Sequence, residues 1–274
     1  MNGVSGIKGT VPVQAGEDDY NIEILQEIEG LEQESFWYQG RRDLIVWAVA
    51  HYFHAAGILL EIGSGTGFIL AAINKARPSL KVVAGDIYLK GLRSVEKRVA
   101  GVSLCQLDVR NLPFHSTLSI IGAFDVLEHI QADEAALQQM FQAVHPSGGM
   151  ILTVPQHPWL WSAMDAMSQH KRRYTRQELV HKVKNAGFSI VRSTSFGALV
   201  FPLKLLEVVV RAVKKKLRLQ DEQVHLARLP KLINQGIYGL MGIENFLIKH
   251  NVSFPFGSSL LLVAKKSPHH ASEP

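Results

Sequence analysis

The chain has 274 residues, of which 47% are hydrophobic and 19% are charged, and this composition excludes a wholly disordered, collagen-like or coiled-coil protein. Its single cysteine, Cys105, excludes an internal disulfide and a cysteine-based zinc site. The net charge of +5 is matched by residues 204–219 alone, where six basic residues oppose one acid (6 − 1 = 5), so a diffuse nucleic-acid-binding surface is not expected.

Apolar runs and helical patterns alternate along the chain from residue 58 onward. The apolar runs predict strands at 58–62, 81–84, 102–107, 118–124, 150–154, 188–193 and 259–264. Helical spacing predicts helices at 68–76, 91–99, 133–144 and 176–186, with residues 145–149 ending the third of these. Such alternation gives right-handed βαβ units, so we predict an α/β fold with a mostly parallel sheet.

A glycine-rich loop, Gly63-Ser-Gly-Thr-Gly67, follows the first strand and opens the first core helix. Glycines there permit a tight turn and a close approach of the backbone to a ligand. The third glycine of a dinucleotide fingerprint would fall on Phe68, so the spacing differs from that motif. Glu61, at the mouth of the loop, would repel a pyrophosphate but attract a ligand that carries an ammonium or a sulfonium.

Two further acids follow the next two strands. Asp86 is placed to accept hydrogen bonds from ribose hydroxyls, and Asp108 could accept from an adenine amine while Ile87 and Val109 pack on the ring. Each acid alone could be a helix cap or a turn residue. Three acids at successive strand ends of one parallel sheet instead indicate a ligand site.

Together with Phe124-Asp-Val-Leu-Glu-His129 and Pro146-Ser-Gly-Gly149, these motifs resemble the class I S-adenosylmethionine-dependent methyltransferases over residues 35–196. The resemblance implies an enzyme with a Rossmann-like, doubly wound, seven-stranded sheet and S-adenosylmethionine as cofactor. It implies that the cofactor is held by Glu61, Ile62, Gly63, Ser64, Gly65, Gly67, Asp86, Ile87, Asp108, Val109, Asp125, Val126 and Leu127. One departure is Leu118-Ser119, where such sequences often carry Phe-Asp.

A narrower resemblance rests on Phe36-Trp37, Arg41-Arg42, and the segments 153–161 and 170–175. These look like a bacterial subgroup, UbiG-like or methyltransferase type 11/23-like, that acts on cell-envelope or small-metabolite substrates. We expect Trp37 and Arg41 to cover the methionine end of the cofactor, although Trp37 could simply be core. The expected division is residues 1–56 as an N-terminal arm with cofactor-covering helices, 57–196 as the core, 197–257 as a helical insertion, and 258–266 as the last core strand.

Methyl transfer from a sulfonium is an in-line displacement, and a hydroxyl acceptor would need a general base. His129 and His170 are the candidates, although His129 could pack under a helix and His170 could belong to a structured loop. A divalent metal is an alternative, because Asp125, Glu128 and His129 would share one face of a helix and His170 could join them. The same residues are also explained by cofactor contacts.

The sequence therefore predicts methylation of a small-molecule, lipid-linked or glycan acceptor, at oxygen. The alternatives are a methyltransferase on RNA or protein, and a non-catalytic module that binds the cofactor. No signal peptide is evident, so we expect a cytoplasmic protein that binds no nucleic acid. Residues 201–219 form a basic amphipathic pattern that suits contact with an anionic membrane surface, or a helix packed on the protein with its charges in water.

Overall fold

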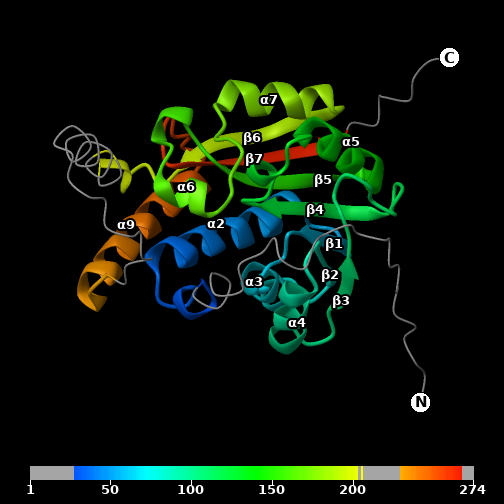
Figure 1. Ribbon diagram of the computed structural model, residues 1–274, viewed down its shortest axis with the longest axis horizontal. Coiled ribbons are helices and arrows are strands. Elements are labelled where there is room, and N and C mark those ends of the chain that lie inside the picture. The colour runs from blue at the N-terminus through cyan, green and yellow to red at the C-terminus, as the bar shows by residue number, and fades with distance from the viewer. Residues whose placement is uncertain (1–27, 203–204, 206–228, 267–274) are drawn as a thin grey trace.

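A computed structural model describes residues 28–202, 205 and 229–266 (Figure 1). Its centre is one seven-stranded sheet in the order β3-β2-β1-β4-β5-β7-β6. Strands β1, β2, β3, β4 and β5 all run parallel to their neighbours within this group, whereas β7 is antiparallel to both of its neighbours, β5 and β6. The predicted Rossmann-like, mostly parallel, doubly wound sheet is confirmed.

The elements alternate as the apolar periodicity predicts. The strands are β1 (Gly57–Ile62), β2 (Leu80–Asp86), β3 (Ser103–Gln106), β4 (Leu118–Phe124), β5 (Val144–Pro155), β6 (Phe188–Phe196) and β7 (Ser259–Lys266). The helices are α2 (Phe36–Tyr52), α3 (Phe68–Ala76), α4 (Leu89–Arg98), α5 (Asp133–Ala143), α6 (Ala163–Met167), α7 (Arg176–Asn185) and α9 (Lys231–Lys249), with 3-10 turns η1 (Leu127–His129) and η2 (Pro158–Leu160).

The start of β5 differs from the sequence prediction. Residues 145–149 were expected to end a helix, but β5 begins at Val144, which pairs with Leu118 of β4. A register shift then brings Gly149 opposite Ile120. Pro146, Gly148 and Gly149 therefore lie in an irregular first part of β5, and α5 ends at Ala143.

Helices cover both faces of the sheet (Figure 1). One core cluster joins the sheet to α5 and α7 through side chains such as Leu137 and Leu179. The other joins it to α2, α3 and α4 through Ile45, Leu70 and Val95. Both faces are buried, which explains why the strands read as continuous apolar runs rather than alternating ones.

Helix α9 lies beside α2 and extends past the end of the sheet (Figure 1). The two helices approach closely at Gly40, where an added Cβ would lie 2.7 Å from Met241 Cε. The Asn245 side-chain amide also donates to the Gly40 carbonyl at 2.9 Å. The described part of the predicted 197–257 insertion is thus helical at α9, whereas most of the basic 201–219 pattern lies outside the described residues. Among the helices of the described residues, none combines the length and apolar character needed to cross a bilayer.

Candidate active site

A cavity of about 1870 Å³ opens at the carboxyl ends of β1, β2 and β4. The strand order reverses between the parallel strands β1 and β4, because β2 and β3 follow on one side of β1 while β4 and β5 lie on the other, and ligands of open α/β sheets bind at such a point. Typical ligand pockets measure about 300–1,000 Å³, so this cavity can hold a cofactor and an acceptor together. The glycine loop and its acids form one wall, the segment from η1 to His170 a second, and α2 with α9 a third.

The glycine loop takes the left-handed conformations that its sequence permits. Gly63, Gly65 and Gly67 have φ values of +63°, +50° and +77°. A Cβ at Gly63 would lie 2.6 Å from Val126 Cγ2, so the loop must lack a side chain there to pass η1. Gly67 is the N-cap of α3 and offers no side chain to the amide groups of the first turn.

Glu61 ends in the cavity wall with one carboxylate oxygen lacking any partner. Its side chain is buried and its Oε2 makes no hydrogen bond. Burial, opposed in part by the nearby Arg41 guanidinium, raises the pKa of Glu61 well above its ordinary value. A buried carboxyl without a partner is costly, and a cationic group of a ligand would compensate it.

The two later acids differ in how much of their hydrogen-bonding capacity is taken up. Asp86 Oδ2 accepts from the Gly65 amide and Oδ1 from the Tyr88 amide, both at 2.9 Å. Burial still raises the pKa of Asp86, although these amides oppose the shift. Asp108 lies at the rim and pairs with Arg110, whose hydrogen bonds outweigh partial burial and lower the pKa of Asp108.

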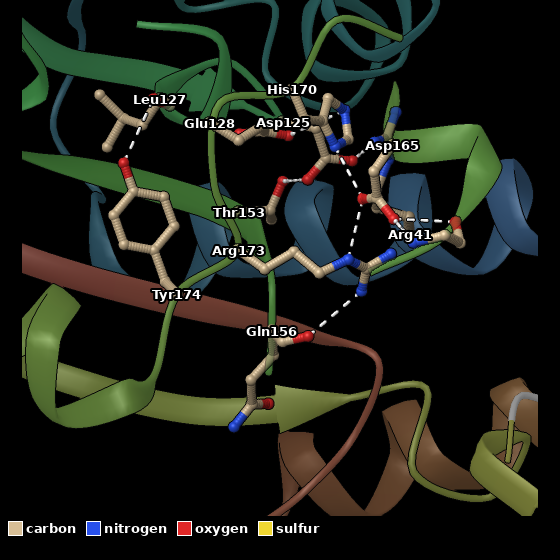
Figure 2. A network of polar contacts seen from close by, with 11 residues as sticks. Arg41, Asp125, Leu127, Glu128, Thr153, Gln156, Asp165, His170, Arg173 and Tyr174 are labelled. Atoms are coloured by element: carbon tan, nitrogen blue, oxygen red, sulfur yellow. Dashed lines mark hydrogen bonds and ion pairs between the residues drawn. The ribbon is translucent and has the colours of Figure 1, made fainter. Parts of the chain in front are cut away.

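Arg41 of α2 reaches across the cavity to Asp125, which follows β4 (Figure 2). Asp125 has a φ of +58° and also accepts a 3.0 Å hydrogen bond from the Thr153 hydroxyl. Arg41 Nε is buried without a partner. Trp37, one turn earlier on α2, lines the cavity and stacks on Phe196 with ring centroids 5.5 Å apart. Arg41 therefore has a further donor for an anionic ligand group.

His170 is held by a buried carboxylate (Figure 2). Its Nδ1 lies 2.9 Å from Asp165 Oδ1, and the same oxygen accepts from Arg173 Nε at 2.8 Å. The Ser162 amide and hydroxyl donate to Asp165 Oδ2 at 2.7 and 2.8 Å. These donors outweigh burial and lower the pKa of Asp165. An ionised Asp165 fixes the tautomer that carries hydrogen on Nδ1, so Nε2 of His170 is an acceptor.

Nε2 of His170 faces Glu128 and His129. It lies 4.0 Å from Glu128 Oε1, and the His129 and His170 ring centroids are 4.7 Å apart. Desolvation by the surrounding chain, followed by the neighbouring His170, lowers the pKa of His129 to about 4, so its ring is neutral at physiological pH. Both oxygens of Glu128 are buried without partners, and burial raises the pKa of Glu128 well above its ordinary value.

These three side chains fit a divalent cation. One ligand atom from each of Glu128, His129 and His170 lies within 4.8 Å of the others. A carboxylate with two imidazoles is a donor set that divalent transition metals accept, and a cation would compensate the unpartnered Glu128 oxygens. Asp125, the fourth member of the metal hypothesis, is instead engaged by Arg41 and Thr153.

The structure brings almost all the predicted site residues to one cavity. Gly67 and Leu127 do not line it: Gly67 caps α3, and Leu127 is buried in the core, where its carbonyl accepts from the Tyr174 hydroxyl at 3.2 Å. The sequence prediction missed Asp165 and Arg173 as partners of His170. The sequence carries only a local signal for Asp165: Ser162-x-x-Asp165 is a capping-box pattern, and the box forms at α6, but this pattern does not point to His170.

Comparison with known proteins agrees with this arrangement. Residues 38–193 match the family model of the methyltransferase domain. A tRNA (guanine-N(7)-)-methyltransferase of Mycobacterium tuberculosis is 36% identical over 81 residues, which are 29% of this chain and 28% of that protein. A ubiquinone/menaquinone biosynthesis C-methyltransferase, UbiE, of Desulfotalea psychrophila is 27% identical over 96 residues, 34% of this chain and 39% of that protein.

A solved complex of the Haloferax volcanii Trm112 methyltransferase activator with a methyltransferase contains a chain of similar fold. The TM-score is 0.59 at 13% identity, over 94% of this chain and 100% of that chain. The two sequence relatives are matched over less than half of their own length. The chain belongs to the methyltransferase family, as a class I S-adenosylmethionine-dependent methyltransferase.

Proposed function

We propose that this methyltransferase acts on a hydroxyl oxygen of a small-molecule, lipid-linked or glycan acceptor. The observation that carries the proposal is the pairing of His170 with Asp165 on the cavity wall. A carboxylate on Nδ1 leaves Nε2 free to take a proton, which a hydroxyl acceptor must lose during transfer. The UbiG-like or methyltransferase type 11/23-like subgroup that we also propose for this chain is supported by the sequence resemblance at Phe36-Trp37, Arg41-Arg42, 153–161 and 170–175.

The cofactor is proposed to lie across the strand ends. The unpartnered oxygen of Glu61 suits the ammonium of the methionine portion, and the free Nε of Arg41 suits its carboxylate. Asp86 would receive the ribose hydroxyls on the lone pairs that its two backbone bonds leave available. The adenine would then lie between Ile87 and Val109 near Asp108.

In the proposed reaction, the acceptor oxygen attacks the methyl carbon in line with the carbon–sulfur bond. That bond breaks, its electron pair stays on sulfur, and S-adenosylhomocysteine forms. The hydroxyl proton passes to Nε2 of His170, and the ionised Asp165 stabilises the resulting imidazolium. His129 remains neutral beside it, so its ring does not repel the imidazolium that forms on His170.

A divalent cation, when bound by Glu128, His129 and His170, would supply Lewis acidity that favours ionisation of the acceptor hydroxyl. With Nδ1 of His170 on Asp165, Nε2 would then be a ligand of the cation rather than the proton acceptor, and the chain would still bring the acceptor oxygen beside η1 and His170. Asp165 orients the imidazole in either circumstance.

The proposal is tested by transfer of a tritiated methyl group from S-adenosylmethionine into separated lipid, glycan, small-molecule, RNA and protein fractions of host extract. Label is expected in one of the first three fractions. His170→Asn should abolish most of it, whereas the matched variant His157→Asn should not, since His157 does not line the cavity. Label in RNA or protein alone, or no transfer with retained cofactor binding, would contradict the proposal.

A further inference from the structure

Helix α9 packs along the first half of α2, the helix that carries Trp37 and Arg41 (Figure 1). The apolar side chains of α2 that are fully buried in the sheet core begin at Leu44. The turns before Leu44 therefore take much of their support from α9. Because α9 lies outside residues 38–193, which the family model matches, this support is an addition to the matched domain.

One stripe of α9 faces α2. Its members recur every three or four residues, as one side of a helix requires: Asn234, Tyr238, Met241 and Asn245. Asn234 Oδ1 accepts from the Phe36 amide at 2.9 Å, and the Tyr238 hydroxyl donates to Asp43 at 2.6 Å. The stripe thus binds α2 at its first residue and again about two turns later.

The other two members of the stripe meet α2 at Gly40, the residue before Arg41. An added Cβ at Gly40 would lie 2.7 Å from Met241 Cε, and the Asn245 side-chain amide donates to the Gly40 carbonyl at 2.9 Å. Met241 and Asn245 are both buried, and neither lines the cavity. Asn245 can therefore affect a ligand in the cavity only through α2.

Helix α9 is itself anchored on the body of the protein. Ile248 is fully buried in the core cluster that α2 and α3 share with the sheet. Glu244, also buried, accepts from the Leu199 amide at 2.9 Å. The position of α9 is fixed in this way, and its contacts with Gly40 fix the first half of α2 in turn.

Arg41 is the residue of α2 whose placement matters most for the cavity. One of its terminal nitrogens pairs with Asp125, and its buried Nε has no partner. A guanidinium binds a carboxylate best when its nitrogens meet both oxygens in one plane, so its position has to be set closely. The backbone at Gly40 and Arg41 determines where this long side chain begins.

We propose that Asn245 is a positioning residue for the cofactor: through the Gly40 carbonyl, it sets where Arg41 meets the methionine carboxylate. The inference rests on the proposed placement of the cofactor, in which Arg41 binds that carboxylate. It gives α9 a role in recognition of the methyl donor, in addition to the three cavity walls already described.

The test compares two ligands by isothermal titration calorimetry. One is S-adenosylhomocysteine, and the other is its decarboxylated analogue, which keeps the adenosine, the sulfur and the ammonium but lacks the carboxylate. Asn245→Ala should weaken binding of S-adenosylhomocysteine about three- to tenfold and leave binding of the analogue within about twofold of wild type. Arg41→Ala should weaken binding of S-adenosylhomocysteine about ten- to hundredfold, and adding Asn245→Ala to it should cause no further loss.

The matched control is Asn185→Ala, which removes an exposed amide from the last turn of α7, outside the cavity lining. It should bind both ligands as wild type does, and circular dichroism verifies that each variant is folded. Tyr238→Phe removes only the hydroxyl that binds Asp43 and should show the same selectivity as Asn245→Ala. It carries the test if Asn245→Ala does not fold.

A merely structural role of Asn245 predicts a different result, because general loosening would weaken both ligands and would persist without Arg41. Equal weakening of both ligands by folded Asn245→Ala, no weakening of either, or a further loss in the double variant would overturn the proposal. If Arg41→Ala weakens both ligands equally or neither, the proposed placement of the cofactor fails and this inference fails with it. Arg41→Ala alone therefore distinguishes the two failures.

Discussion

Replacement of Asp86 by alanine is expected to weaken binding of S-adenosylhomocysteine by about 1.5–3 kcal/mol, roughly ten- to hundredfold. The carboxylate has two tasks in the structure. It accepts the Gly65 and Tyr88 amides at 2.9 Å each, which shapes the glycine loop, and it lines the cavity where ribose hydroxyls would lie. A hydrogen bond to a charged group contributes about 1.5–3 kcal/mol, so the loss of one such bond already accounts for the expected effect.

Isothermal titration calorimetry measures this loss without any acceptor. Glu134→Ala is the matched control, because it removes an exposed acid from the first turn of α5, outside the cavity lining. Thermal melting establishes that both variants are folded. The reasoning is refuted if folded Asp86→Ala binds S-adenosylhomocysteine as tightly as wild type does.

Three further predictions concern the histidine side of the cavity. His170→Asn should lower turnover about 10²–10⁴-fold with nearly unchanged affinity for S-adenosylhomocysteine, and a full rate with the native acceptor would exclude His170 as the base. Burial raises the pKa of Glu128, so the folded state binds more protons than the unfolded one, and the free energy of unfolding falls as pH rises above the ordinary glutamate pKa. Glu128→Gln should therefore raise the melting temperature at neutral pH and have little effect on it at about pH 4. An equal change of the melting temperature at both pH values would contradict this. Zinc chloride should raise the melting temperature of wild type through the Glu128, His129 and His170 donors but leave that of Glu128→Gln unchanged, and equal responses would exclude this metal site.

The sheet and the cofactor wall were predictable because both depend on local signals. Continuous apolar runs identify buried strands, and parallel strands place their carboxyl ends at one edge. Glu61 and Asp86 lie at the carboxyl ends of β1 and β2, and Asp108 follows β3, so their positions in the chain already imply their position in space. The start of β5 was missed because the Pro-Ser-Gly-Gly stretch is typical of turns, while its pairing with β4 is set by tertiary contacts.

The part of the cavity that carries His129 and His170 was predictable only in part. His129 follows β4, and that local position places it at the sheet edge, but its contact with His170 depends on the path of the chain after β5. Asp165 was missed because a capping box explains it locally, and its second use as the partner of His170 appears only in three dimensions. The exposure of apolar side chains on α9, such as Leu232 and Phe246, was likewise hidden, since helical periodicity does not reveal which side of an amphipathic helix faces the protein.

The most direct test of the proposed function is the chemical environment of the transferred methyl group. The enzyme would be supplied with S-adenosylmethionine labelled with carbon-13 at the methyl position and with the acceptor-containing fraction of host extract. Carbon–proton correlation spectra of the product should show a methyl resonance of the oxygen-bound type, absent with His170→Asn. A labelled methyl group on nitrogen or carbon, or an oxygen-bound one that His170→Asn forms at the wild-type rate, would contradict the account.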